Sequence, residues 1–156
     1  MEILRFTVNA GRYAVPLADV REVTRAAAIA YLPEVPPVIE GILDLRGELV
    51  PVLDVRIRFG LPAEALNQNH YFIIARAGTR TIALRVDAAP DIATIGAPDV
   101  TDPRAITVGT RSIGGVARLP DGLVLIHALE TFLTAAESEW LEEKLADESG
   151  LRGVGG

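Results

Sequence analysis

The sequence predicts a mainly β protein built from small barrels with few helices. Three observations lead there: short runs with an apolar residue at every second position, turn residues between those runs, and no repeating strand and helix alternation of the kind a parallel sheet needs. Of the 156 residues, 49% are hydrophobic and only 5% aromatic, so the core must be mostly aliphatic. A chain of this length suits one domain or two small fused barrels.

The first element is a hairpin, with strands expected over residues 3–8 and 12–17. Asn9 and Gly11 lie in the connection, and both residue types tolerate the positive φ of a hairpin turn. Residues 18–24 should continue as a short helix, or as a turn and a strand. We expect this segment to direct Val20 and Val23 inward and Glu22 outward.

The next expected element is a strand over residues 49–59, where every odd position is apolar. Pro51 cannot donate a ladder hydrogen bond, so this strand should lie at a sheet edge or carry a bulge. The preceding residues 38–40 are expected to form one helical turn that stops at Gly41.

A tight bend is expected between Gly41 and that strand, because residues 44–48 hold the polar side chains and the glycine that a turn needs. Arg46 should point out of this bend. From its chemistry alone, Arg46 reads either as a solvated turn residue or as a contact residue on a functional loop.

Two further hairpins are expected in the second half of the chain. The first joins residues 71–75 to residues 81–86, where Ile82, Leu84 and Val86 alternate with Thr81, Ala83 and Arg85. The second joins residues 113–119 to residues 123–126 through Pro120, Asp121 and Gly122, a strong turn signal. Residues 88–101 have the prolines and scattered apolar residues of short strands and turns.

The last element is an amphipathic helix over about 135–147. Thr134 and Glu137 have the spacing of a capping box, in which each side chain accepts a hydrogen bond from the other residue's backbone N–H. Leu141 and Leu145 lie four residues apart and share one face. Residues 149–156 are rich in glycine, and we expect a flexible tail there.

Charge and composition exclude several classes of function. The net charge of −6 and the isoelectric point near 4.9 argue against nucleic acid or an anionic membrane surface as partners. The absence of cysteine excludes disulfides, thiolate metal sites and a thiol nucleophile. No signal-peptide pattern or membrane-length apolar run occurs, so we expect a cytoplasmic protein without direct membrane insertion.

The sequence contains few candidate catalytic groups. His70 and His127 are the only histidines, and both adjoin strand-like runs where a structural or solvent-facing role is expected. Asp44 and Asp54 read as turn and strand-end residues. No nucleophile elbow, phosphate loop or metal-ligand cluster is present, so we expect no enzyme, no cofactor and no metal.

An alternative stays open at this point: a small barrel that binds a low-molecular-weight ligand, or an enzyme that uses such a pocket. A deep polar pocket around His70 or His127 would favour it. A shallow groove near Val20 and Arg46 would instead favour a protein adaptor.

The block GILDLRG at residues 41–47, followed by LVPVLDVR at 49–56 and by Phe59, resembles the signature of CheW-like domains, the coupling proteins of bacterial chemotaxis arrays. The family more often has asparagine at the position of Asp44, and either residue suits a turn. Further similarity spans roughly the whole chain, at residues 4–8, 13–15, 20–23, 82–87, 123–126 and 129–133.

The resemblance implies a fold of two SH3-like five-stranded β-barrel subdomains within one domain over residues 1–148. Subdomain 1 should span about 1–66 and subdomain 2 about 70–133, with terminal strands that can cross between the barrels. The resemblance also implies a non-enzymatic scaffold that links the regulatory domain of the histidine kinase CheA to the helical tip of a chemoreceptor.

The family's functionally sensitive positions correspond here to Val20, Glu22, Gly41 and Arg46, which are therefore the expected partner-binding residues. We expect Glu22 and Arg46 to approach each other and the pair to orient the arginine. Gly41 should meet a backbone need, because a side chain there would crowd the turn or an approaching helix.

Overall fold

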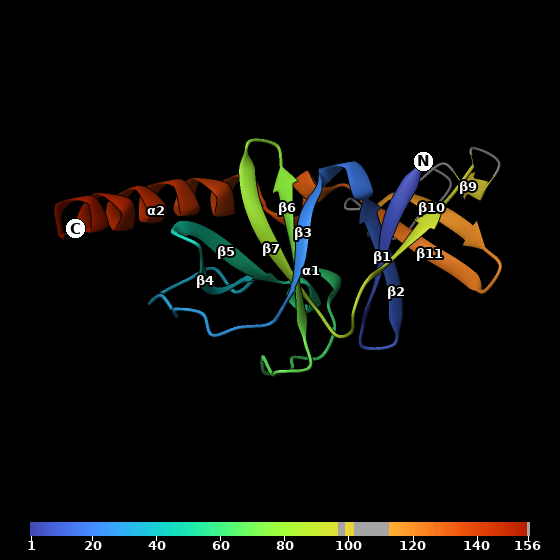
Figure 1. Ribbon diagram of the computed structural model, residues 1–156, viewed down its shortest axis with the longest axis horizontal. Coiled ribbons are helices and arrows are strands. Elements are labelled where there is room, and N and C mark those ends of the chain that lie inside the picture. Colours follow the sequence, from blue (N-terminus) through green and yellow to red (C-terminus); the bar gives the residue numbers. More distant parts are fainter. Residues whose placement is uncertain (97–98, 102–112, 156) are drawn as a thin grey trace.

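The computed structural model describes residues 1–96, 99–101 and 113–155, which form two β-sheets with few helices (Figure 1). The mainly β prediction is confirmed. The five-stranded sheet has the order β3 (Val20–Arg25), β6 (Tyr71–Ala77), β7 (Arg80–Val86), β5 (Glu48–Asp54), β4 (Ile39–Leu45). The six-stranded sheet has the order β8 (Asp91–Thr94), β1 (Glu2–Val8), β2 (Gly11–Pro16), β11 (Gly122–His127), β10 (Ile113–Leu119), β9 (Val100–Thr101).

The three predicted hairpins are confirmed as antiparallel pairs: β1 with β2, β6 with β7, and β10 with β11. Asn9 has a φ of 54° in the first turn, as its place between the strands predicted. β8 and β9 are the short strands expected within residues 88–101. Local alternation and turn chemistry were sufficient to predict these elements.

The strand predicted over residues 49–59 is wrong in its second half. β5 ends at Asp54, whose Oδ1 accepts a hydrogen bond from the backbone N–H of Arg56 at 3.1 Å and so caps the helix α1 (Val55–Phe59). Pro51 does not mark an edge, since β5 lies between β7 and β4. The parallel pairing with β7 begins only at Val52, so Pro51 lies outside that ladder.

The helical turn expected at residues 38–40 is also wrong, because β4 begins at Ile39. Ile39 pairs with Leu53 and Gly41 with Val52, with a register shift between the two pairs. The segment before Gly41 is a strand because β5 supplies its hydrogen-bonding partners. Local sequence does not reveal that β5 lies beside it.

The sheets divide the chain differently from the expected cut at residues 66–70. β6 and β7 belong with β3, β4 and β5, whereas β1 and β2 join the sheet formed by β8–β11. The parallel pairing of β11 with β2 brings the N-terminal hairpin into that sheet. Terminal strands therefore cross between the two halves of the chain, and the second sheet has six strands among the described residues.

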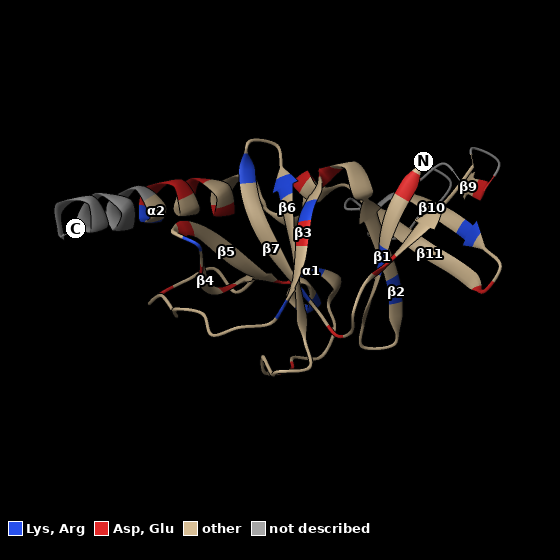
Figure 2. Cartoon of the chain, in the orientation of Figure 1, with Lys and Arg blue, Asp and Glu red and all other residues tan. Residues whose placement is uncertain are grey.

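The C-terminal helix α2 (Ala135–Gly155) begins with the predicted capping box: Glu137 N–H donates to Thr134 Oγ1 at 3.1 Å, and Thr134 N–H donates to Glu137 Oε1 at 2.7 Å. The helix continues past residue 147, so residues 149–155 are helical where a flexible tail was expected. No proline interrupts its ladder, and a glycine costs only about 1 kcal/mol in a helix. Several acidic residues lie along the N-terminal half of this helix (Figure 2).

One hydrophobic core joins the two sheets. It combines residues of β1 and β2 with residues of β6 and β7, and adds Leu129, Phe132 and the α2 residue Leu141, which are all fully buried. Each sheet also has a smaller core of its own. The shared core holds the two sheets together, and α2 adds its first turns to it.

Candidate functional site

The signature bend is a two-residue hairpin turn between β4 and β5. Arg46 has a φ of 50° and Gly47 a φ of 91°, as a type I′ turn requires at both central positions. Asp44 Oδ1 accepts a hydrogen bond from Gly47 N–H at 2.8 Å and stabilises the turn. The Arg46 side chain is 67% exposed, so the bend displays it as the sequence predicted.

Two ion pairs connect this turn to β3. Arg46 Nη2 donates to Glu22 Oε1 at 3.1 Å and to Glu22 Oε2 at 2.9 Å, which confirms the expected pair. Arg21 Nη1 donates to Glu48 Oε1 at 2.7 Å, and this hydrogen bond lowers the pKa of Glu48. Because β3 and β4 are opposite edges of the five-stranded sheet, the pairs link its two ends. Exposed pairs of this kind contribute about 0 to 1 kcal/mol each.

Gly41 meets a backbone need, which is confirmed, although its neighbour is an extended segment and not the turn or a helix. A Cβ at residue 41 would lie 2.4 Å from the carbonyl oxygen of Ala30. Ala30 and Ile42 exchange two backbone hydrogen bonds of 2.8 Å across the same contact. Gly41 is buried, so its influence on any partner must pass through the chain that covers it.

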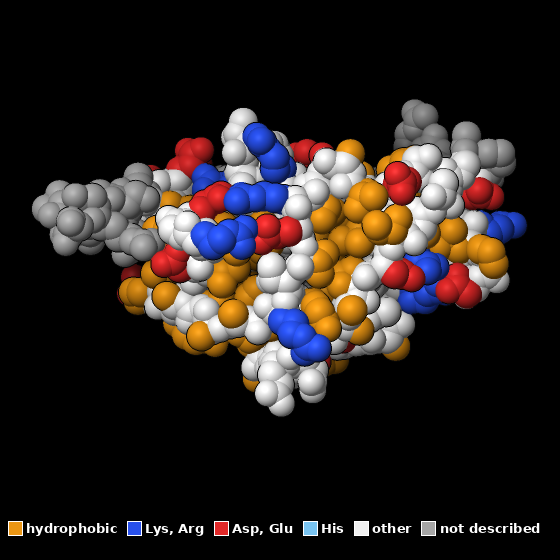
Figure 3. Space-filling view, in the orientation of Figure 1, with side chains coloured by type: hydrophobic (Ala, Val, Ile, Leu, Met, Phe, Trp, Pro, Cys, Tyr) orange, Lys and Arg blue, Asp and Glu red, His pale blue; other side chains and the backbone are white. Residues whose placement is uncertain are grey.

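β3 pairs with β6 through Val20 opposite Ala75 and Glu22 opposite Ile74, with a register shift between these two pairs. Val20 packs against the shared core, whereas Val23 is 39% exposed. The expectation that Val23 points inward is wrong, since this side chain is among the exposed large hydrophobic ones. Apolar side chains gather on the surface between β3 and β1 (Figure 3), and exposed Ile92 of β8 is another large apolar residue on the molecule's surface.

A second group of polar residues lies near the joint of the sheets, around two buried arginines and a buried histidine. We call it the buried charge cluster, and its members are Glu40, Asp54, Arg56, Glu64, His70, Arg85 and Asp87. Arg56 Nη2 donates to Glu64 Oε2 at 3.0 Å and also to Asp87 Oδ1. Arg85 Nη2 donates to the backbone oxygen of Glu64 at 2.7 Å, and its Nε donates to Glu40. Both guanidinium groups are almost fully buried.

His70 is an acceptor at Nδ1. The backbone N–H of Asn67 lies 3.3 Å from Nδ1 and Arg85 Nη1 lies 3.1 Å from it. Both groups can only donate, which favours an acceptor at Nδ1, and the Asn67 side-chain amide nitrogen Nδ2, another donor, lies 3.2 Å from Nε2. Burial, and then the charge of Arg85, lower the pKa of His70. Burial raises the pKa of Glu40 against the opposing effect of Arg85.

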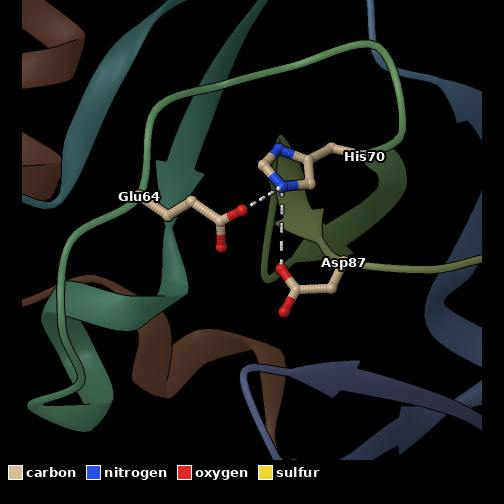
Figure 4. Close-up of side chains that lie close together, drawn as sticks. All are labelled: Glu64, His70 and Asp87. Atoms are coloured by element: carbon tan, nitrogen blue, oxygen red, sulfur yellow. Dashed lines mark ion pairs between the residues drawn. The ribbon is translucent and has the colours of Figure 1, made fainter.

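Glu64, His70 and Asp87 come close enough to be considered as metal ligands, since their nearest ligand atoms lie within 4.8 Å of one another (Figure 4). His70 Nε2 is 3.5 Å from Glu64 Oε1 and 3.8 Å from Asp87 Oδ1. Asn67 Nδ2 also lies 3.2 Å from that nitrogen, however, and Arg56 already holds both carboxylates. The arrangement is that of an ion network, not of a vacant metal centre.

His127 has a different environment. Its ring packs among Tyr13, Phe59 and Phe132, with ring centroids 5.7, 4.7 and 5.6 Å away. It is buried at the end of β11. Both histidines thus have the structural role that the sequence suggested, and both are buried.

A family model covers both sheets of this fold. The model of the CheW-like domain matches residues 2–137. The chain belongs to the CheW-like domain family. It is 25% identical to the chemotaxis protein CheW of Klebsiella aerogenes, over 87% of this chain and 83% of that protein. It is 27% identical to the chemotaxis protein CheW of Rhizobium meliloti, over 88% and 90% of the two chains.

A solved structure agrees with the family assignment. The crystal structure of the scaffolding protein TtCheW from Thermoanaerobacter tengcongensis matches with a TM-score of 0.80 and 28% identity, and the match covers 87% of this chain and 94% of that one. The CheW-like fold has two SH3-like β subdomains, and its family is one of non-enzymatic scaffold proteins. The chain therefore has a scaffold or adaptor role in chemotaxis. Among the described residues, no helix is long and apolar enough to cross a membrane.

Two surface hollows of this CheW-like chain lie away from its histidines. One of about 240 Å³ is lined by residues of β1 and β2 with Asp91 and Asp121, and one of about 260 Å³ by Ala26 and Leu66 with their neighbours. His70 and His127 line neither hollow. Neither of these two hollows is therefore the polar pocket around a histidine that would favour a small-molecule barrel.

Sequence reasoning missed the buried charge cluster. Arg56 and Arg85 alternate with apolar residues in the sequence and were therefore assigned to solvent-facing positions, but their side chains are 0% and 1% exposed. Only the fold shows that the carboxylates of Asp54, Glu64 and Asp87 converge on the two arginines.

Proposed function

We propose that this chain couples chemoreceptors to the histidine kinase CheA in a bacterial chemosensory array and acts in the cytoplasm without catalysing a reaction. Family membership supports the scaffold role. The observation that carries the finer proposal is Arg46, a largely exposed guanidinium on a rigid two-residue turn, held at one nitrogen by Glu22. Its other two nitrogens have no hydrogen-bond partner among the described residues and can meet a partner.

The four partner-binding residues have different parts in this proposal. Arg46 is the contact residue, and Glu22 orients it. Val20 anchors β3 against the shared core, which fixes the position of Glu22. Gly41 allows Ala30 to close over β4, so it shapes the same edge of the sheet without touching a partner.

Coupling needs two surfaces that respond to each other. The two sheets supply two bodies, and the shared core and the buried charge cluster connect them. We propose that the kinase regulatory domain and the receptor tip bind at separate surfaces of this pair. A small displacement at one surface can then change the contacts at the other.

The test is a calorimetric titration of the chain with the CheA regulatory domain and, separately, with a receptor-tip fragment from the same genome. Arg46→Ala should weaken binding to one of them by roughly 5- to 30-fold, which corresponds to the loss of about 1 to 2 kcal/mol at an interface arginine. Glu22→Ala should weaken the same interaction less, because it removes orientation and not contact.

Arg118→Ala is the matched control, since Arg118 is an exposed arginine on β10 of the other sheet. It should leave the binding that depends on Arg46 unchanged. Equal binding by wild type and Arg46→Ala would reject the site. Failure of the folded wild type to bind either partner would reject the coupling function itself.

A further inference from the structure

The buried charge cluster lies where the two sheets meet. Asp87 follows β7 and leads toward β8, and its backbone N–H donates to Thr7 of β1 at 3.0 Å. Its Oδ2 accepts from Asn9 N–H at 2.5 Å, and Arg56 Nε donates to Asn9 Oδ1 at 3.3 Å. Asp87 and Arg56 therefore bind the turn between β1 and β2 to the five-stranded sheet.

The connection from α1 to β6, residues 61–70, closes over this joint. It is attached through Glu64, whose carboxylate meets Arg56 and whose backbone oxygen meets Arg85. It is attached again at its end, where His70 Nδ1 lies 3.1 Å from Arg85 Nη1, while the contact of Asn67 N–H with the same nitrogen lies within the connection itself. Between these points its side chains are mostly exposed, so few apolar contacts hold it closed.

We propose that His70 makes this connection an acid-sensitive latch: protonation of its ring releases residues 61–70 from the joint between the sheets. Nδ1 faces two obligate donors, the Asn67 N–H and Arg85 Nη1. A proton on Nδ1 would turn an acceptor toward them into a third donor. Flipping the ring would present a carbon in its place, so both hydrogen bonds are lost either way.

Charged groups from every neighbouring element act on that ring. Arg85 of β7 and Arg56 of α1 oppose a positive charge, while Glu64 of the connection and Asp87 attract one from the Nε2 side. Asp54 at the end of β5 and Glu40 of β4 act through Arg85. The two carboxylates nearest His70 are already paired with Arg56, which leaves them less able to stabilise an imidazolium.

The direction of the pH effect follows from this geometry. The closed state holds His70 neutral, because burial and Arg85 lower its pKa, whereas an open, hydrated ring titrates near about 6.5. The latch is thus fully closed above that pH and is weakened as the pH falls below it. Glu40, whose pKa burial raises, stabilises the closed state toward acid and has the opposite sign.

Hydrogen exchange of the whole chain, followed by mass spectrometry, tests the latch without any partner. The opening equilibrium of residues 61–70 should rise about tenfold between pH 7.5 and 5.5, after correction for intrinsic exchange, for a group that gains a proton near 6.5 on opening. His70→Gln keeps an acceptor for Asn67 and Arg85 but has no titration, so it should abolish the rise. His127→Gln, at the other buried histidine, should keep it.

A second measurement keeps the proposal falsifiable if His70→Gln disturbs the fold. In His127→Gln, His70 is the sole histidine, and its ring can be titrated by NMR. A transition below that of a free imidazole, accompanied by faster exchange of residues 61–70, supports the latch. A ring that titrates normally while the connection stays protected, or an equal acid response in wild type and His70→Gln, would overturn it.

Discussion

Replacing Gly41 by alanine should destabilise the chain far more than a glycine substitution in an exposed turn. The new Cβ would lie 2.4 Å from the Ala30 oxygen, where ordinary contact begins at 3.4 Å, and that oxygen belongs to backbone that cannot rotate away. Relief requires separating Ala30 from Ile42, which costs their two hydrogen bonds at roughly 1 kcal/mol each. Overpacking adds about 1 to 3 kcal/mol, for a total of about 3 to 5 kcal/mol.

Urea unfolding followed by circular dichroism measures this effect. With a slope of about 2 kcal/mol per M, the Gly41→Ala midpoint should fall by about 1.5 to 2.5 M. Gly47→Ala is the matched control: its φ is 91° but no atom lies within 4 Å of the added Cβ, so only backbone strain of about 1 kcal/mol is expected. A Gly41→Ala shift no larger than that of Gly47→Ala would refute the close approach of Ala30.

Three other substitutions test the packing and the caps by the same unfolding assay. Asp87→Asn removes the carboxylate that Arg56 and Asn9 share. It should cost about 3 kcal/mol because a buried guanidinium loses one of its counter-charges, and a change below about 1 kcal/mol would contradict the ion network. Thr134→Ala removes one half of the capping box and should cost about 1 kcal/mol, with loss of helical signal if α2 frays. Leu141→Ala truncates a fully buried α2 side chain and should cost about 2 to 5 kcal/mol, whereas no change would show that α2 does not pack on the shared core.

Hairpins were predictable because their information is local. In β6–β7 and β10–β11 an alternating run, a turn containing glycine and a second alternating run follow one another within twenty residues, and each pairs with its sequence neighbour. The bend at Arg46 and its contact with Glu22 were also anticipated, the bend from composition and the contact from family resemblance.

Elements whose state depends on distant partners were not predictable. Val55 and Phe59 are four residues apart, a spacing that suits an alternating strand and one face of a helix equally well, and the cap at Asp54 decides for the helix. Residues 39–41 become a strand because β5 is beside them. The convergence of Arg56 and Arg85 on carboxylates from four segments has no signature in sequence spacing at all.

The assignment of β1 and β2 to the six-stranded sheet has a consequence for synthesis of the chain. The hairpin of β1 and β2 leaves the ribosome before the five-stranded sheet does, yet its partner β11 lies about a hundred residues later. At ~5–20 residues per second the hairpin waits on the order of 5 to 20 s for that strand, while the complete five-stranded sheet can form in between. During this interval the apolar face of β1 and β2 is exposed unless the newly formed five-stranded sheet covers it. The order of translation therefore lets the sheet that is completed earlier protect the strands of the later one from aggregation.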